Sequence, residues 1–168
     1  NTSPPNVYDP GSVFSTFERA AGIVVPYQSD FSVQSFTAEL WLKPESTSDK
    51  YQPIYMRADD QGDGATRNFS LWIVPDSTEV HATFYGGTAP DNSAGQVTIE
   101  SGNRLANASG DGGTDGSLNL KEWNHLAWSY NADNGETALY INGTAVTTAV
   151  VDSSHRIPVD NAENIYIG

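Results

Sequence analysis

The chain contains no cysteine, so neither a disulfide framework nor a thiolate metal site can form. Lysine and arginine are scarce: there are 8, against 21 aspartates and glutamates, which gives a net charge of −13. A chain with so few cations lacks the positive face that binding to nucleic acid or to an anionic membrane requires. No apolar run approaches the length of a membrane span, and no segment keeps a helical period. These absences favour an all-β protein that does not insert into a membrane.

The residues that are present fit one domain spanning 1–168. Hydrophobic residues make up 38% of the chain and aromatic residues 11%, which is enough for one core and too much for a disordered chain. Residues 1–11 are polar, contain three prolines and read as a leader or linker. The acidity has two compatible explanations: solubility in a salty environment, or carboxylates that hold a divalent cation.

The strongest local pattern lies between residues 122 and 143. Leu126, Trp128 and Tyr130 alternate with smaller or polar residues, as in a strand with one buried face. The turn residues at 133–135 and the dipeptide at 142–143 both favour hairpins, and the Asn-Gly dipeptide favours a two-residue primed turn. Local chemistry therefore predicts three successive antiparallel strands here.

Similar patterns predict the remaining strands. Residues 36–43 alternate so that Phe36, Ala38, Leu40 and Leu42 share one face, which we expect to be buried. Shorter strands are expected within 19–27, 51–56, 69–74, 80–84, 97–99, 145–151 and 165–167. Residues 101–117 form the longest stretch that we expect to be irregular, and loops of that length are often functional.

Three segments carry a family resemblance. The first is the hairpin in which Trp123, His125 and Leu126 are followed by the Leu-Tyr-Ile-Asn-Gly run at 139–143. The second is the strand at 35–44, and the third is the Asn-Ile-Tyr-Ile-Gly run at 164–168. Together they resemble the laminin G-like and pentraxin-like group of concanavalin A-like jelly rolls. The resemblance implies a two-sheet antiparallel jelly-roll sandwich. The same fold hosts lectins, adhesins, enzymes and structural spacers, so it says less about the ligand.

The chain departs from the family pattern after Gly168, because members of the group continue with one or two further strands. We therefore expect a sandwich that lacks its last strand or receives it from another segment. An open sheet edge of this kind is a template for strand addition, so a complementing strand from the rest of the parent protein is an expected partner.

Two acidic, glycine-rich loops are the candidate metal site. Closely spaced aspartates on a flexible loop offer the hard oxygen ligands that Ca²⁺ prefers, although neither loop has the EF-hand spacing. The alternative explanation is a pair of solvated turns. Relatives in the resembling group bind calcium in loops at one end of the sandwich, which favours the metal. The predicted ligands are Asp59, Asp63, Asp111 and Asp115, with the Asp-Asn pairs at 91–92 and 133–134 as weaker alternatives that more simply form turns.

Carbohydrate binding needs an exposed aromatic plane together with hydrogen-bonding groups for the hydroxyls. Trp41, Trp72, Tyr85 and Tyr140 lie on strand faces opposite the predicted core, and each is a candidate either for a ligand contact or for packing under a loop. We assign Trp123 and Trp128 to packing.

Catalysis is not expected. Glycosidases of the laminarinase type carry a Glu-x-Asp-x-x-Glu string on one strand, and no such string occurs. Glu39 stands alone on its strand, and neither Glu100 nor Glu122 has a carboxylate two positions away. The histidines match no metalloprotease motif or serine elbow: His81, His125 and His155.

The sequence thus predicts a non-catalytic, Ca²⁺-dependent binding module of a secreted or cell-surface protein, of the kind found in bacterial surface adhesins. Its expected ligand is carbohydrate or a surface protein, recognised in adhesion. The alternatives are a structural or interaction module that holds calcium without a small ligand, and one part of a split domain completed by another segment.

Overall fold

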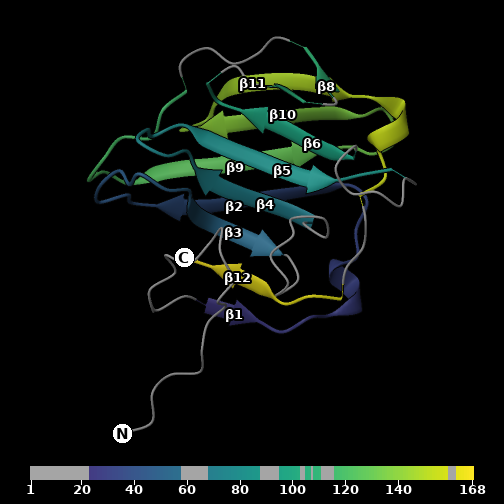
Figure 1. The fold of residues 1–168 in the computed structure, drawn as a ribbon, viewed down its shortest axis with the longest axis horizontal. Helices are drawn as coiled ribbons and strands as arrows, with labels where there is room; N and C mark the ends of the chain where they lie inside the picture. Colours follow the sequence, from purple (N-terminus) through teal and green to yellow (C-terminus); the bar gives the residue numbers. More distant parts are fainter. Residues whose placement is uncertain are drawn as a thin grey trace, which may run out of the picture.

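The protein is built from two antiparallel sheets stacked face to face, as Figure 1 shows for the computed structural model. The structure describes residues 23–57, 68–87, 95–102, 105–106, 108–110, 116–158 and 162–168. We call the seven-stranded layer sheet A and the five-stranded layer sheet B. Two short 3-10 helices, η1 (Ser29–Phe31) and η2 (Ser153–His155), lie in connections between strands. The predicted two-sheet jelly-roll sandwich is confirmed.

Sheet B contains the hairpins predicted from local sequence. Its strand order is β2-β9-β10-β11-β8. The bounds are β2 (Phe36–Leu42), β8 (Ala108–Ser109), β9 (Asn124–Tyr130), β10 (Glu136–Ile141) and β11 (Thr144–Val151). Asn142 and Gly143 both have positive φ, 52° and 80°, as the predicted primed turn requires. β2 is an edge strand, with β9 on one side and no described strand on the other.

Sheet A gathers strands from both ends of the chain in the order β1-β12-β3-β4-β5-β6-β7. The bounds are β1 (Ile23–Val25), β3 (Gln52–Arg57), β4 (Asn68–Ile73), β5 (Val80–Tyr85), β6 (Gln96–Glu100), β7 (Leu105–Ala106) and β12 (Ile165–Ile167). In Figure 1 the purple β1 and yellow β12 lie together at one side of the molecule, although they are far apart in sequence.

The core lies between the sheets and uses the faces that alternation predicts. Leu126, Trp128 and Tyr130 of β9 are buried against the inward residues of β4, β5 and β6. The inward residues of β2 are only partly buried, as is usual at a sheet edge. Burying each large apolar side chain contributes roughly 1.5–3 kcal/mol before conformational entropy is counted.

The prediction that 101–117 is irregular throughout was wrong. β7 and β8 lie inside this stretch, and Leu105 of β7 pairs with Ile99 of β6. Strands of two residues are too short to leave an alternating pattern in the sequence. They form because the edges of β6 and β11 offer backbone partners, which only the assembled sheets provide.

Candidate functional site

Each sheet has an outer face that points away from the core, and the outer face of sheet A is polar but closed. Strand register places Trp72, His81 and Glu100 in one row across β4, β5 and β6. Ser70, Thr83 and Thr98 form the next row. All six residues are buried, with at most 6% of their surface exposed. A sugar or peptide could not reach them without displacing other parts of the protein.

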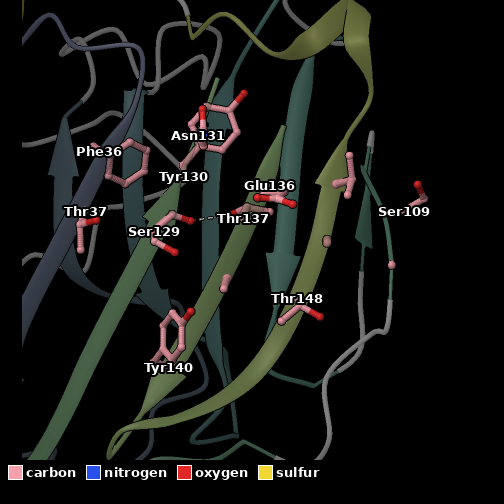
Figure 2. A pocket seen from close by; sticks show the side chains of 14 residues that line it. Phe36, Thr37, Ser109, Ser129, Tyr130, Asn131, Glu136, Thr137, Tyr140 and Thr148 are labelled. Carbon is pink, nitrogen blue, oxygen red and sulfur yellow. Dashed lines mark hydrogen bonds between the residues drawn. The ribbon is translucent and has the colours of Figure 1, made fainter. Parts of the chain in front are cut away.

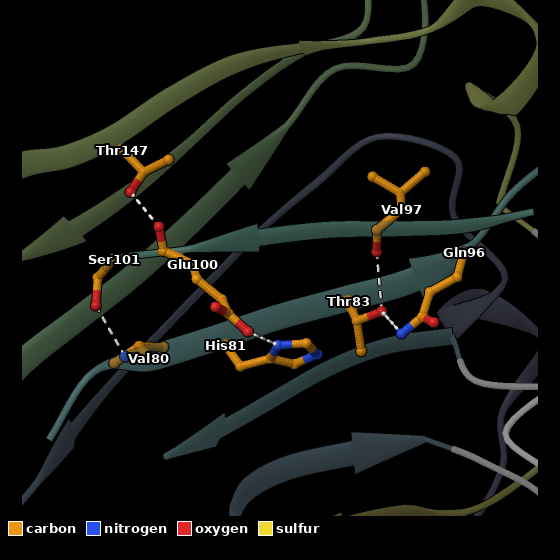
Figure 3. Close-up of polar contacts among 8 residues, drawn as sticks. All are labelled: Val80, His81, Thr83, Gln96, Val97, Glu100, Ser101 and Thr147. Carbon is orange, nitrogen blue, oxygen red and sulfur yellow. Dashed lines mark hydrogen bonds and ion pairs between the residues drawn. The ribbon is translucent and has the colours of Figure 1, made fainter. Parts of the chain in front are cut away.

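The polar groups of the closed face form two separate hydrogen-bonded sets (Figure 3). His81 Nδ1 lies 2.5 Å from Glu100 Oε1. The Tyr51 ring packs edge-on against the His81 ring, with 5.4 Å between the ring centroids. Thr83 Oγ1 donates to the carbonyl of Val97, while Gln96 Nε2 donates to Thr83 Oγ1. Buried polar groups need partners of this kind, so we interpret the His81–Glu100 pair as structural.

The outer face of sheet B is open and carries a groove. The groove has a volume of about 690 Å³ and crosses all five strands of the sheet (Figure 2). Its central row follows the strand register, from Thr37 through Ser129 and Ala138 to Thr148. These side chains are small, so the middle of the face is hollow while longer side chains border it. Further lining residues include Ser109, Asn131, Glu136 and Tyr140.

The groove offers hydrogen-bonding groups and an aromatic ring on one surface. Hydroxyls come from Thr37, Ser129 and Thr148, and a carboxylate comes from Glu136, whose Oε2 accepts from Asn134 Nδ2 at 2.8 Å. The Tyr140 ring is half-buried and points into the groove. Hydroxyls can both donate and accept, and a ring face covers apolar C–H groups. Such a surface suits a polyhydroxylated ligand.

Tyr130 supports the end of the groove from below. Burial raises the pKa of Tyr130 to about 12, although the nearby Arg156 acts in the opposite direction. The hydroxyl therefore stays protonated at neutral pH and donates to the carbonyl of Arg156. This bond ties β9 to the segment after η2.

Two exposed tryptophans lie at one end of sheet B. Trp41 pairs with His125 across β2 and β9, and their rings lie 5.1 Å apart. His125 Nε2 also lies 3.5 Å from Glu39 Oε2. Trp123 comes immediately before β9, so it lies at the same end of sheet B as Trp41 and His125. Both tryptophans are 65% exposed.

The structure separates the predicted aromatic candidates. Trp41 and Tyr140 lie on the open face of sheet B, whereas Trp72 and Tyr85 are buried on the closed face of sheet A. The assignment of Trp128 to packing is confirmed, since it is 1% exposed and its Nε1 donates to Thr137. The assignment of Trp123 to packing was wrong. It lies just before β9, at the end of that strand, and 65% of its surface is exposed.

The predicted calcium ligands cannot be placed: Asp59, Asp63, Asp111 and Asp115 lie outside the described residues, and so do Asp91 and Asn92. Asp133 and Asn134 are described and lie in the β9–β10 turn, where the Asn131 and Asn134 side chains cap backbone N–H groups. Within the described ranges no three acidic or histidine side chains come close enough to share a metal ion.

Sequence reasoning did not single out Thr37, Ser129, Glu136 or Thr148 as a group. Alternation alone places each of them on an outer face, but strand pairing is needed to bring them into one groove. The usable signal was the smallness of Ala127, Ser129 and Ala138, because small outward side chains on adjacent strands leave a hollow.

Comparisons with solved structures find the same fold in proteins of low sequence identity. The mouse laminin α1 chain, domains LG4-5, is 14% identical with a TM-score of 0.59, covering 88% of this chain and 31% of that chain. The CBM40 of the Ruminococcus gnavus IT-sialidase, bound to α2,3-sialyllactose, is 15% identical with a TM-score of 0.54, covering 88% of this chain and 76% of that one. This chain thus spans about a third of the laminin fragment. No curated protein sequence matches it.

A family comparison covers nearly the whole chain. Residues 17–168 match the laminin G family described as the concanavalin A-like lectin/glucanases superfamily. The match includes β2, the β9–β10 hairpin and β12, which contain the segments that carried the resemblance in the sequence. The chain therefore belongs to the concanavalin A-like lectin/glucanase superfamily.

Proposed function

We propose that this chain is a non-catalytic carbohydrate-binding module whose ligand lies in the groove on the outer face of sheet B. The observation that carries the proposal is the groove itself: an open hollow of about 690 Å³ that combines hydroxyl groups, a carboxylate and the Tyr140 ring. Sugar-binding sites need hydrogen-bonding groups for the hydroxyls and an apolar surface for the ring. The closed face of sheet A offers polar groups but no access.

The arrangement of carboxylates supports binding rather than hydrolysis. Glycoside hydrolysis uses two carboxyl groups that flank the scissile bond. Among the described lining residues of the groove, Glu136 is the one acidic side chain. Glu100, on the other sheet, is buried against His81. The sialyllactose-bound CBM40 shows that a domain with this fold can hold a sugar, and we infer the same general role here.

We further propose that the module acts outside the cell, in a secreted or surface protein, and that Ca²⁺ supports its binding. The lack of cysteine and the net charge of −13 fit a bacterial surface protein. No described helix is long and apolar enough to cross a membrane. A surface protein as ligand, and a structural module that holds calcium without a small ligand, are the competing functions.

A glycan array tests the proposal, with Ala138→Phe as the groove variant. Ala138 lies in the central row, so a phenyl ring there fills the hollow while an aromatic residue remains compatible with the strand. We expect the wild type to bind at least one glycan and Ala138→Phe to reduce its affinity by about tenfold or more, or about 1.4 kcal/mol.

Val24→Phe is the matched control, because Val24 is an exposed strand residue on sheet A. It should bind like the wild type. Equal binding by wild type and Ala138→Phe would show that the ligand does not bind in the groove. A folded wild type that binds no glycan would refute the carbohydrate-binding function. Loss of glycan binding in EDTA would support the calcium requirement, whereas unchanged binding would remove it.

A further inference from the structure

Trp41 lies in line with the groove, and Trp123 lies at the same end of sheet B. Along β2 the outward residues run from Trp41 through Glu39 to Thr37, and Thr37 lines the groove. Along β9 they run from His125 through Ala127 to Ser129, which also lines it. Each step of two residues covers about 7 Å, so Trp41 lies roughly 14 Å along the strand from Thr37. The groove and Trp41 therefore form one strip parallel to the strands, and Trp123 lies at the end of sheet B where this strip ends.

An extended ligand could use the whole strip. Trp41 and Trp123 are among the most exposed large apolar side chains of the described structure. Indoles at 65% exposure gain from being covered by an apolar surface, and the C–H face of a sugar ring provides one. Between the tryptophans and the groove, the small Ala127 lies in register between Glu39 of β2 and Tyr140 of β10.

The charges on the strip limit the class of ligand. Neither lysine nor arginine lines the groove among the described residues. Near the tryptophan end, Lys43 Nζ lies 3.1 Å from Glu45 Oε1, and beside the groove Arg156 donates to the carbonyls of Val151 and Asp133. Anionic sugars are typically held by cations in bidentate contacts, and the overall charge of −13 repels them.

Each of the two carboxylates on the strip contacts a neighbouring side chain. Glu136 accepts from the Asn134 amide, and Glu39 faces His125. The other groups on the strip are hydroxyl groups, the Tyr140 ring and the two indoles, and these suit an uncharged chain of sugars.

We propose that the ligand is an uncharged polysaccharide, bound lengthwise along the strands from the groove to Trp41 and Trp123. The inference rests on the proposed carbohydrate-binding function and deepens it. The tryptophans add stacking positions that only a ligand longer than the groove can reach.

Affinity measured against oligosaccharide length tests this. The neutral polysaccharide is whichever of β-glucan, xylan and galactomannan binds best, and the probes are oligosaccharides of increasing length cut from it. Heparin, polygalacturonate and sialyllactose are the anionic counterparts. Wild type should bind the neutral series more tightly as length increases, with little change between low and high salt. Trp41→Ala and Trp123→Ala should each weaken the longest member by about tenfold and leave the shortest unchanged.

Ile23→Ala is the control for loss of an exposed apolar side chain, since Ile23 is 62% exposed on β1 of sheet A. Affinity that is independent of length, or equal losses for short and long ligands, would refute the extended strip. Tighter, salt-sensitive binding of an anionic probe through the groove would refute the uncharged ligand and leave the carbohydrate-binding function standing. Binding of no saccharide at all would overturn both.

Discussion

Tyr130 illustrates how a single core residue links the sheet to a distant segment. Its ring packs between the sheets, 4.9 Å from that of Phe84, while its hydroxyl donates to the carbonyl of Arg156. The same burial that makes the ring stabilising disfavours the phenolate. The pKa is therefore raised from 10.0 to about 12 in the folded protein.

This shift predicts a loss of stability in alkali. A folded-state pKa above the unfolded value stabilises the protein below pH 10.0, and that contribution is lost as the pH rises toward about 12. Tyr130→Phe removes the hydrogen bond to Arg156, so its free energy of unfolding at neutral pH should be about 1 kcal/mol lower than that of wild type. It should also unfold with a shallower pH dependence than wild type between pH 10 and 12.

Urea unfolding at a series of pH values measures both effects. Tyr140→Phe serves as the control, because Tyr140 lies on the outer face of the sheet. Among the described residues, its hydroxyl makes no hydrogen bond to a distant segment. Parallel pH profiles for wild type and Tyr130→Phe would show that this hydroxyl does not contribute.

At the scale of elements, the β10–β11 hairpin depends on its two-residue turn. Asn142 and Gly143 both adopt positive φ, and the Asn142 side chain accepts from the His125 backbone N–H at 2.9 Å. The turn is therefore bonded to β9 as well as to its own hairpin. A Cβ built on Gly143 would meet no atom within 4 Å, so only the backbone conformation requires glycine there.

Gly143→Ala isolates that conformational requirement. Alanine has to adopt the left-handed region at a cost of roughly 1–2 kcal/mol, with no steric clash to add to it. Thermal or urea unfolding should show this loss. Gly143→Asn should recover most of it, because asparagine tolerates positive φ. Equal stability of the alanine variant and wild type would mean that the hairpin accepts another turn.

For the whole molecule, the excess of acidic residues raises the question of a bound cation. A net charge of −13 means that carboxylates repel one another across the surface unless a cation or salt neutralises them. The four aspartates predicted to bind calcium lie outside the described residues, so their role stays a prediction.

Calcium should raise the melting temperature if that prediction holds. An ion present at a hundred times its dissociation constant stabilises by about 2.7 kcal/mol, or roughly 5–10 °C for a domain of this size. EDTA should reverse the rise, and the double variant Asp111→Asn, Asp115→Asn should abolish it. Sodium chloride at matched ionic strength controls for general screening. An unchanged melting temperature across millimolar Ca²⁺ would exclude a tight site.

The sequence by itself determined the longer strands and their inward faces, but not the two-residue strands β7 and β8. The alternation around Leu126, Trp128 and Tyr130 and the Asn142-Gly143 turn are local properties, and the structure follows both. Period-2 patterns and turn chemistry act over a few residues, so they can be read without knowing the partner strands.

Only the tertiary structure decided which outward residues are available to a ligand. Trp41 and Trp72 have equivalent places in the alternation of their strands, yet one is 65% exposed and the other 2%. The groove likewise needs Thr37, Ser129 and Thr148 from three strands in register. Alternation specifies only that a side chain leaves the core, whereas its exposure depends on neighbours that are distant in the sequence.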